Sequence, residues 1–321
     1  MLVWDRQDAE RLMPLESSPT RTYQNHHIDS TRWSVYRPRA GDIVVCNAYK
    51  SGSTWMQQIL TLLLGASHES ILELRKLSFW VEALAGRGDK QAVAAALEAV
   101  PGRRVLKSHL PLDGMPTYAG VHYIVLGRDP RDVFMSLHNH YSSFTDFAYS
   151  IYNDRPDRVG PPLPRCPEDP RLFWRDWITR GWFPWERDGY PFWTNLGHVA
   201  SFWPHRAAEN VLFVHYASML ADLEAAVRRV ANFVGIAASD ALIADVVETT
   251  TFDNVKKTIA ASTPTESGGP SVLRGGLDSF FFRGQNGRWR SVLTDEDLAL
   301  YVEARDQILT PESAAWIEGR G

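Results

Sequence analysis

Cysteine is nearly absent from this sequence: Cys46 and Cys166 are the only two among 321 residues. Two cysteines are too few for a disulfide framework or for a structural zinc site. Long apolar runs are missing as well, since no uncharged stretch reaches the roughly 20 residues that a membrane-spanning helix needs. These absences predict a chain that folds around an ordinary apolar core and has no membrane span.

The sequence also lacks an excess of positive charge. Its 34 Lys and Arg residues stand against 38 Asp and Glu residues, which gives a net charge of -4. This balance argues against a broad nucleic-acid surface but allows a local cationic cleft for one anionic ligand. The first residues, MLVWDRQDAERLMPLE, lack the basic-then-apolar pattern of a signal peptide. We therefore expect a cytoplasmic protein without a nucleic-acid partner.

Short apolar runs alternate with helical patterns along the chain, which is typical of a mostly parallel sheet flanked by helices. The predicted strands are 43–47, 104–107, 121–127 and 211–215, and the predicted helices are 54–64, 89–99, 131–140, 217–234 and 238–249. Ser239 and Asp240 form a fair N-cap for the last helix. Two stretches rich in turn-forming residues, 154–170 and 261–277, are predicted to be loops.

No linker divides the chain cleanly, so the sequence predicts a single α/β domain. Its body would span 41–307. Residues 1–40 would form an N-terminal extension of the same domain, and residues 308–321 a C-terminal tail.

The stretch NAYKSGSTW, residues 47–55, joins the first predicted strand to the first predicted helix. Ligands of parallel α/β sheets bind at such strand-to-helix turns. Ser51, Gly52 and Ser53 offer backbone N–H groups, the helix start adds the positive end of its dipole, and Lys50 adds a full charge. In a Walker A loop the lysine instead follows the glycines. The stretch therefore predicts an anion site of a different kind, or else a capped turn with Trp55 in the core.

Two further motifs follow predicted strands at the same edge of the sheet. KSHLP places Lys107 and His109 at one strand end, and a histidine there can take a proton from an attacking hydroxyl. GRDPRDVFMS places Arg128 at the next strand end and Ser136 along the following helix. A guanidinium at this position suits a phosphate. The alternative for Arg128 is a solvated ion-pair cluster at a helix start.

Together these motifs resemble those of cytosolic-type sulfotransferases that use 3′-phosphoadenosine 5′-phosphosulfate (PAPS). KSGSTW is similar to the family's Y-P-K-S-G-T-T-W, KSHLP to K-T-H-L-P, and GRDPRDVFMS to R-N-P-K-D-V-x-x-S. The late stretch RGQNGRWR, residues 283–290, is similar to R-K-G-x-x-G-D-W-K. The resemblance covers about residues 41 to 294 in the family's order. It implies a P-loop-like α/β fold, PAPS as donor, 3′-phosphoadenosine 5′-phosphate (PAP) as product, and no metal.

The resemblance also implies roles for single residues. His109 would be the catalytic base, and Lys107 and Lys50 would neutralise charge on the transferring sulfuryl group and the leaving phosphate, as in phosphoryl transfer. The implied donor-binding residues are Lys50, Ser51, Gly52, Ser53 and Thr54 at the 5′-phosphosulfate, Trp55, Tyr216, Thr250, Thr251 and Phe252 around the nucleotide, and Arg128, Ser136, Arg283 and Gly284 at the 3′-phosphate.

The chain departs from the family pattern at a few positions. Tyr49 stands where the family has proline before the loop lysine, and Phe282 takes the arginine position of the late motif. The family's dimerisation motif is incomplete, because Asp295 and Ala299 occupy its later key positions. The oligomeric state is therefore left open.

Tryptophans gather in one part of the chain: 6 of the 12 fall between Trp174 and Trp203. They predict either an aromatic core or an apolar acceptor pocket, to which Phe79, Trp80 and residues 280–282 could contribute. The expected acceptor is a hydrophobic alcohol or phenol. Three alternatives remain: a catalytically silent protein that binds 3′-phosphonucleotides, a P-loop small-molecule kinase, and a dehydratase that uses sulfonation as activation.

Overall fold

The computed structural model describes residues 13–66, 74, 77–86, 88–261, 271–276 and 285–320. Its sheet has the strand order β2-β3-β1-β4-β5. The strands are β1 (Ile43–Cys46), β2 (Ser78–Trp80), β3 (Val105–Ser108), β4 (His122–Gly127) and β5 (Val211–His215). All of their pairings are parallel, which confirms the predicted α/β fold. The edge strand β2 was not predicted, since its 3 residues are too few to show a pattern.

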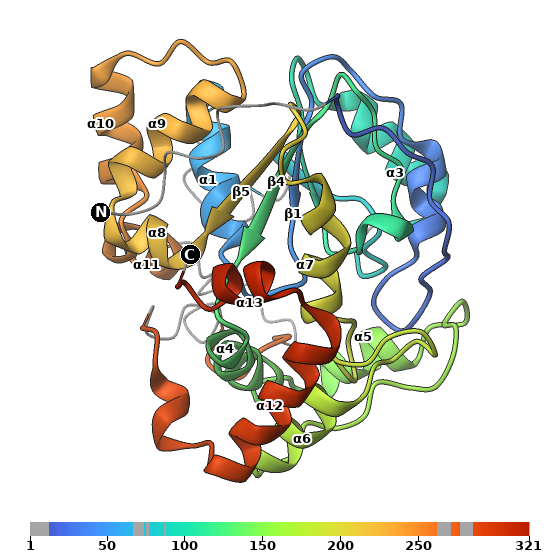
Figure 1. Cartoon of the computed structure of the whole chain (residues 1–321). Helices are drawn as coiled ribbons and strands as arrows, with labels where there is room; N and C mark the ends of the chain where they lie inside the picture. The colour runs from blue at the N-terminus through green and yellow to red at the C-terminus, as the bar shows by residue number, and fades with distance from the viewer. Residues whose placement is uncertain are drawn as a thin grey trace.

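Helices cover both faces of the sheet (Figure 1). Residues of β1 alternate between two apolar clusters, with Ile43 and Val45 in one and Val44 and Cys46 in the other. The first cluster is completed by α1 (Ser53–Leu63), α9 (Leu223–Phe233) and α10 (Asp240–Thr249). The second receives α3 (Lys90–Ala99) and α7 (Leu196–Phe202). Burial on both faces explains why the strands are continuously apolar.

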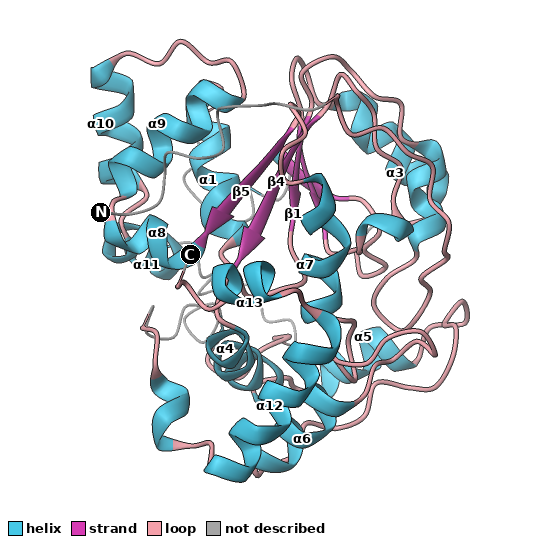
Figure 2. Ribbon diagram, in the orientation of Figure 1, coloured by secondary structure: helices cyan, strands magenta, loops and turns pink. Residues whose placement is uncertain are grey.

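A second group of helices lies beyond the carboxyl ends of the strands, as Figure 2 shows. It consists of α4 (Pro130–Ser142), α5 (Asp146–Asn153), α6 (Pro170–Thr179) and α12 (Asp295–Ile308). The last helix, α13 (Pro311–Ile317), packs on the end of β4: a Cβ added to Gly127 would lie 2.2 Å from the ring of Trp316. Residues near both ends of the described chain, such as Tyr23, Trp33 and Ile317, are buried in the main core.

Some helix predictions were wrong in detail. The predicted helix 217–234 is two helices, α8 (Tyr216–Ala221) and α9, because Asp222 adopts an extended conformation (φ -150, ψ 90) and its carboxylate caps α9 through the Ala225 N–H. Ser239 caps α10 as predicted. The loop 154–170 is confirmed up to Pro170, where α6 begins. Most of the predicted loop 261–277 lies outside the described residues, and α11 (Phe252–Ala261) precedes it.

None of the described helices combines the length and the apolar character needed to cross a bilayer.

Candidate active site

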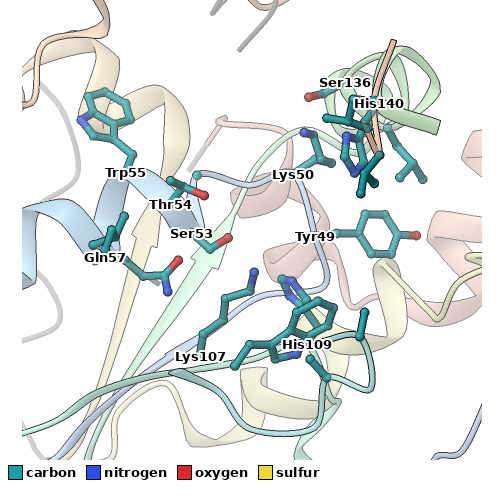
Figure 3. Close-up of a pocket in the computed structure, with 18 of the residues that line it drawn as sticks. Tyr49, Lys50, Ser53, Thr54, Trp55, Gln57, Lys107, His109, Ser136 and His140 are labelled. Atoms are coloured by element: carbon teal, nitrogen blue, oxygen red, sulfur yellow. The ribbon is translucent and has the colours of Figure 1, made fainter. Parts of the chain in front are cut away.

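The candidate site lies where β1 ends, between β3 on one side and β4 on the other. Chain connections diverge at this point, and ligands of open α/β sheets bind there. Lys50 follows β1, His109 follows β3, Arg128 follows β4 and Tyr216 follows β5. All of them line one cavity of about 2020 Å³, together with Lys107. Figure 3 shows Lys50, Lys107 and His109 around the same space.

The loop after β1 is bent into an unusual conformation. Lys50 has a φ of 52, and no other non-glycine residue in the described part of the chain has a positive φ. Gly52, two residues later, has a φ of 96. A non-glycine residue in this region costs on the order of 1–3 kcal/mol and is common at functional sites. Arg128 holds the bend, since its Nη1 donates to the Lys50 carbonyl at 3.1 Å. Position 52 favours glycine because its φ of 96 strains any L side chain, and an added Cβ would also lie 3.0 Å from the Tyr216 ring.

The start of α1 is left without a side-chain cap. Gly52 is its N-cap and carries no capping oxygen. The first N–H groups of a helix need acceptors, which an anion can supply. Ser53 and Thr54 line the cavity at this helix start. This end of the cavity can therefore bind a phosphate or a sulfuryl group.

His109 is held by two hydrogen bonds, one from its backbone and one from its ring, and the second sets its tautomer. Its backbone N–H donates to Oε1 of Glu82 at 2.6 Å, and its Nδ1 lies 2.5 Å from the carbonyl oxygen of Asn47. A carbonyl oxygen only accepts, so Nδ1 carries the proton and Nε2 keeps a lone pair. Burial, and then the charge of Lys107, lower the pKa of His109 well below its usual range. The neutral imidazole can accept a proton at Nε2.

Glu82 organises the surroundings of this histidine. Its fully buried carboxylate accepts hydrogen bonds from the indoles of Trp33 and Trp80, from the Ser108 hydroxyl and from the His109 backbone. The Trp80 ring in turn lies 4.6 Å from Nζ of Lys107, as in a cation–π contact. Sequence reasoning missed Glu82, because it follows the short strand β2.

Arg128 is buried and takes part in a network that reaches the late motif. Its guanidinium donates to Oδ1 of Asn286 at 2.8 and 3.2 Å and lies 4.2 Å from the Tyr216 ring centroid. The solvated ion-pair alternative is therefore wrong for Arg128. Its neighbours Arg131 and Asp129 do form an ion pair at 2.6 Å, but their side chains are only 19% and 15% exposed. Asn286 was not predicted, although it lies inside the motif RGQNGRWR.

This geometry agrees with the comparison with known proteins. A family model described as "Sulfotransferase domain" matches residues 40–308. The chain belongs to the sulfotransferase domain family. It is thus an enzyme that transfers a sulfuryl group, and the match decides against the kinase alternative.

The sulfotransferase matches one curated relative over nearly its whole length and a human one over a shorter part. A glycolipid sulfotransferase of Mycobacterium tuberculosis is 28% identical over 312 residues, which cover 93% of this chain and 94% of that protein. The human sulfotransferase 2B1 is 26% identical over 262 residues, covering 80% of this chain and 62% of the human protein.

Solved structures show the same fold. A retinol dehydratase in complex with androsterone and PAP has a TM-score of 0.66 at 21% identity, covering 92% of this chain and 89% of that one. A mouse sulfotransferase complexed with PAP has a TM-score of 0.64 at 20% identity, covering 89% and 90%. These likenesses confirm the predicted P-loop-like α/β fold of the sulfotransferase.

Four of the remaining residues predicted for the donor site of the sulfotransferase also line the cavity. They are Trp55, Ser136, Thr250 and Phe252. Trp55 is fixed there, because its indole N–H donates to the Thr250 carbonyl at 2.7 Å and its ring meets Tyr216 edge-on.

Two predicted residues point elsewhere, and two cannot be placed. The Ser51 hydroxyl donates to the Tyr49 carbonyl and the Thr251 hydroxyl to the Glu248 carbonyl, and neither residue lines the cavity. Arg283 and Gly284 lie outside the described residues, as do residues 280–282. Any role of Ser51, Thr251 and residues 280–284 therefore stays a prediction.

The other half of the cavity is mostly apolar. The apolar lining residues include Phe79, Trp80, Ala83, Phe144, Phe147, Ile151, Tyr152, Phe192, Trp193 and Leu273. Of the tryptophans between Trp174 and Trp203, Trp193 is the one among the described lining residues. Trp174 and Trp177 are fully buried in the core, and Trp185 is 40% exposed. The aromatic-core interpretation thus holds for most of this group, and the pocket interpretation for Trp193.

Among the residues that the structure describes, no group of three or more His, Cys, Asp and Glu side chains could hold a metal ion.

Proposed function

We propose that this sulfotransferase takes the sulfuryl group from PAPS and transfers it to a hydroxyl of a lipid or apolar small molecule, with His109 as general base. The observation that carries the proposal is the contact of Nδ1 of His109 with the Asn47 carbonyl, which leaves the lone pair on Nε2 of a ring that lines the same cavity as Lys50 and Lys107. A base and two lysines that line one cavity suit in-line transfer between an alcohol and a phosphate leaving group.

The donor would occupy the half of the cavity at the loop after β1. Lys50, Ser53, Thr54 and the start of α1 would bind the 5′-phosphosulfate. Arg128 is fixed by Asn286 and the Lys50 carbonyl, and its remaining N–H groups on Nη1 and Nη2 would bind the 3′-phosphate. The related enzymes that were crystallised with PAP support this donor.

The reaction would proceed in one displacement. Nε2 of His109 takes the proton of the acceptor hydroxyl while its oxygen attacks sulfur, and the bond from sulfur to the 5′-phosphate oxygen breaks. The negative charge moves from the acceptor oxygen to the leaving PAP. Lys50 and Lys107 lie where they can stabilise the equatorial oxygens and that leaving oxygen.

The acceptor would occupy the apolar half. A cavity of about 2020 Å³ exceeds the roughly 300–1,000 Å³ of a typical single-ligand site, so donor and acceptor can be bound together. A relative that is named a glycolipid sulfotransferase and a neighbour that binds androsterone support a lipid-like alcohol or phenol. Both cysteines are free, which suits the cytoplasm that we propose as its location.

Calorimetry with PAP, 5′-AMP and ATP tests the donor assignment. We expect clear preference for PAP, and Arg128→Gln should weaken PAP binding about 10- to 100-fold while changing 5′-AMP binding little, because it removes a charge-assisted bidentate contact. Equal binding of the three nucleotides would contradict the proposal. Mass spectrometry of the product then distinguishes a sulfate ester from the dehydrated product of the alternative reaction.

A further inference from the structure

His27 lies in the acceptor half of the cavity, although it comes from the N-terminal segment and from none of the family motifs. It lines the cavity and is only 6% exposed. Its ring stacks on Tyr152 with centroids 3.7 Å apart and meets Trp193 edge-on at 6.0 Å. Trp193 also stacks along His109 at 5.7 Å. His27 and the proposed base therefore share one indole as a neighbour.

The proton positions on His27 follow from a chain of hydrogen bonds. Nε2 of His26 lies 2.9 Å from the Pro191 carbonyl and must donate to it. In a neutral His26 the other nitrogen, Nδ1, then carries a lone pair. This Nδ1 pairs with Nδ1 of His27, so His27 is the donor in that contact. Nε2 of His27 is consequently left without a proton, as a hydrogen-bond acceptor.

Burial supports this assignment, because it lowers the pKa of His26 to about 3 and that of His27 well below its usual range. Both rings are neutral at physiological pH. No described residue donates a hydrogen bond to Nε2 of His27. Nε2 of His27 is not among the enclosed side-chain atoms without a partner, so it is an accessible acceptor in a ring that lines the cavity, and it can pair there with water or a ligand.

We propose that Nε2 of His27 accepts a hydrogen bond from a second hydroxyl of the acceptor substrate, while the reacting hydroxyl lies at Nε2 of His109. The proposal rests on the proposed function and narrows its acceptor class. The substrate is an amphipathic molecule with at least two hydroxyls, such as a lipid with a polyhydroxylated headgroup. A site that pairs with a hydroxyl discriminates against the analogue that lacks it, because its own polar group is then unpaired.

Transfer from PAPS to octyl β-D-glucopyranoside and to its four monodeoxy analogues tests this assignment. 2-Naphthol and 1-octanol serve as acceptors with a single hydroxyl. In the wild type, one deoxy analogue should lose about tenfold in kcat/KM relative to the parent glucoside, since one buried hydrogen bond is lost. In His27→Phe, the parent glucoside should fall by a similar factor and become equal to that analogue. Turnover of 2-naphthol should remain near the wild-type value.

The controls separate a local effect from a loss of structure. His205→Phe removes a partly buried imidazole that does not line the cavity, and it should leave every ratio unchanged. Thermal unfolding and PAP calorimetry report whether His27→Phe is folded; if it is not, His27→Gln replaces it. The deoxy analogue that lacks the reacting hydroxyl is recognised by its loss of turnover in every variant.

Equal wild-type turnover of the parent and the remaining deoxy glucosides would overturn the role of His27 and leave the proposed function intact. If the enzyme sulfonates 2-naphthol or 1-octanol but none of the glucosides, the role of His27 is likewise overturned and the proposed function stands. No transfer to any of these acceptors by a protein that binds PAP would overturn both. A loss confined to one deoxy analogue that disappears in the His27 variant supports the proposal.

Discussion

The backbone carbonyl of Asn47 accepts a hydrogen bond from Nδ1 of His109 at 2.5 Å. The two residues stand one position beyond Cys46 and Ser108, which are partners in the parallel register of β1 and β3. The register of the sheet thus brings the carbonyl and the imidazole together. Because this contact commits the ring proton to Nδ1, the sheet itself prepares Nε2 as a base.

Removal of the imidazole should separate catalysis from binding. His109→Ala is expected to lower kcat about 10²- to 10⁴-fold, the usual contribution of a general base. PAP binding should change little, because the proposed donor contacts come from other residues. Steady-state kinetics with PAPS and calorimetry with PAP provide the two readouts, with His205→Ala as control. Retained turnover would remove His109 as the base.

PAP binding should take up a proton at pH 8. Burial, and then the charges of Arg128 and Lys107, lower the pKa of Lys50 to about 7, so the empty protein holds a mostly neutral Lys50 at this pH. An anionic ligand favours the charged form and restores its proton. Binding heats at pH 8 should therefore depend on the ionisation enthalpy of the buffer, and affinity should fall as pH rises above about 7. In Lys50→Met both effects should be absent.

The lowered pKa of Lys50 should also make the unfolding free energy of the ligand-free protein depend on pH. Between pH 7 and the usual lysine value of 10.5, unfolded Lys50 keeps a proton that folded Lys50 has lost. The unfolding free energy of the wild type should thus rise over this range relative to that of Lys50→Met. Urea unfolding of both proteins at several pH values measures the difference. Parallel pH profiles would argue against a depressed lysine.

Glu82 should be needed for both stability and rate. In Glu82→Gln one carboxylate oxygen becomes an amino group, which cannot accept from Trp33 or from the donors on the opposite oxygen. We expect a loss of about 1–3 kcal/mol in unfolding free energy, the cost of leaving a buried donor unpaired. The rate should also fall, because the backbone of His109 loses its anchor. Glu98→Gln, on the surface of α3, should change neither the unfolding free energy nor the rate appreciably.

Tyr49, which stands where the family has a proline, connects Trp177 to Trp193 by hydrogen bonds. Its buried hydroxyl accepts from the Trp177 indole at 2.7 Å and donates to the Trp193 carbonyl at 3.0 Å. Tyr49→Phe should cost about 1–3 kcal/mol in stability, because two buried polar groups lose their partner. It should raise the acceptor KM through Trp193 more than it weakens PAP binding.

The matched control for this change is Tyr190→Phe, since the Tyr190 hydroxyl makes no hydrogen bond with the described residues. Urea unfolding and acceptor kinetics compare the two variants. Equal stability of Tyr49→Phe and the wild type would show that the bridge to Trp177 and Trp193 is dispensable.

The sequence alone predicted the parallel α/β fold and the strand-end positions of Lys50, His109 and Arg128. These features are local: an apolar strand followed by glycine, serine or a cation is visible within ten residues, and parallel strands bring their carboxyl ends to one edge. Local pattern was insufficient where a strand was very short, as at β2, or where one aspartate ended a helix, as at Asp222.

The tertiary structure decided how the site is built. It joined Glu82 and Asn47 to His109, Asn286 to Arg128, and Tyr49 to Trp193. It also chose Trp193 from a run of tryptophans and brought His27 to the same indole. The partners of Arg128 and Tyr49 lie 158 and 144 residues away in the chain, so no periodicity or motif relates them. The sequence determined which chemical groups are available at the strand ends, and long-range packing determined which nitrogen of His109 can act as a base.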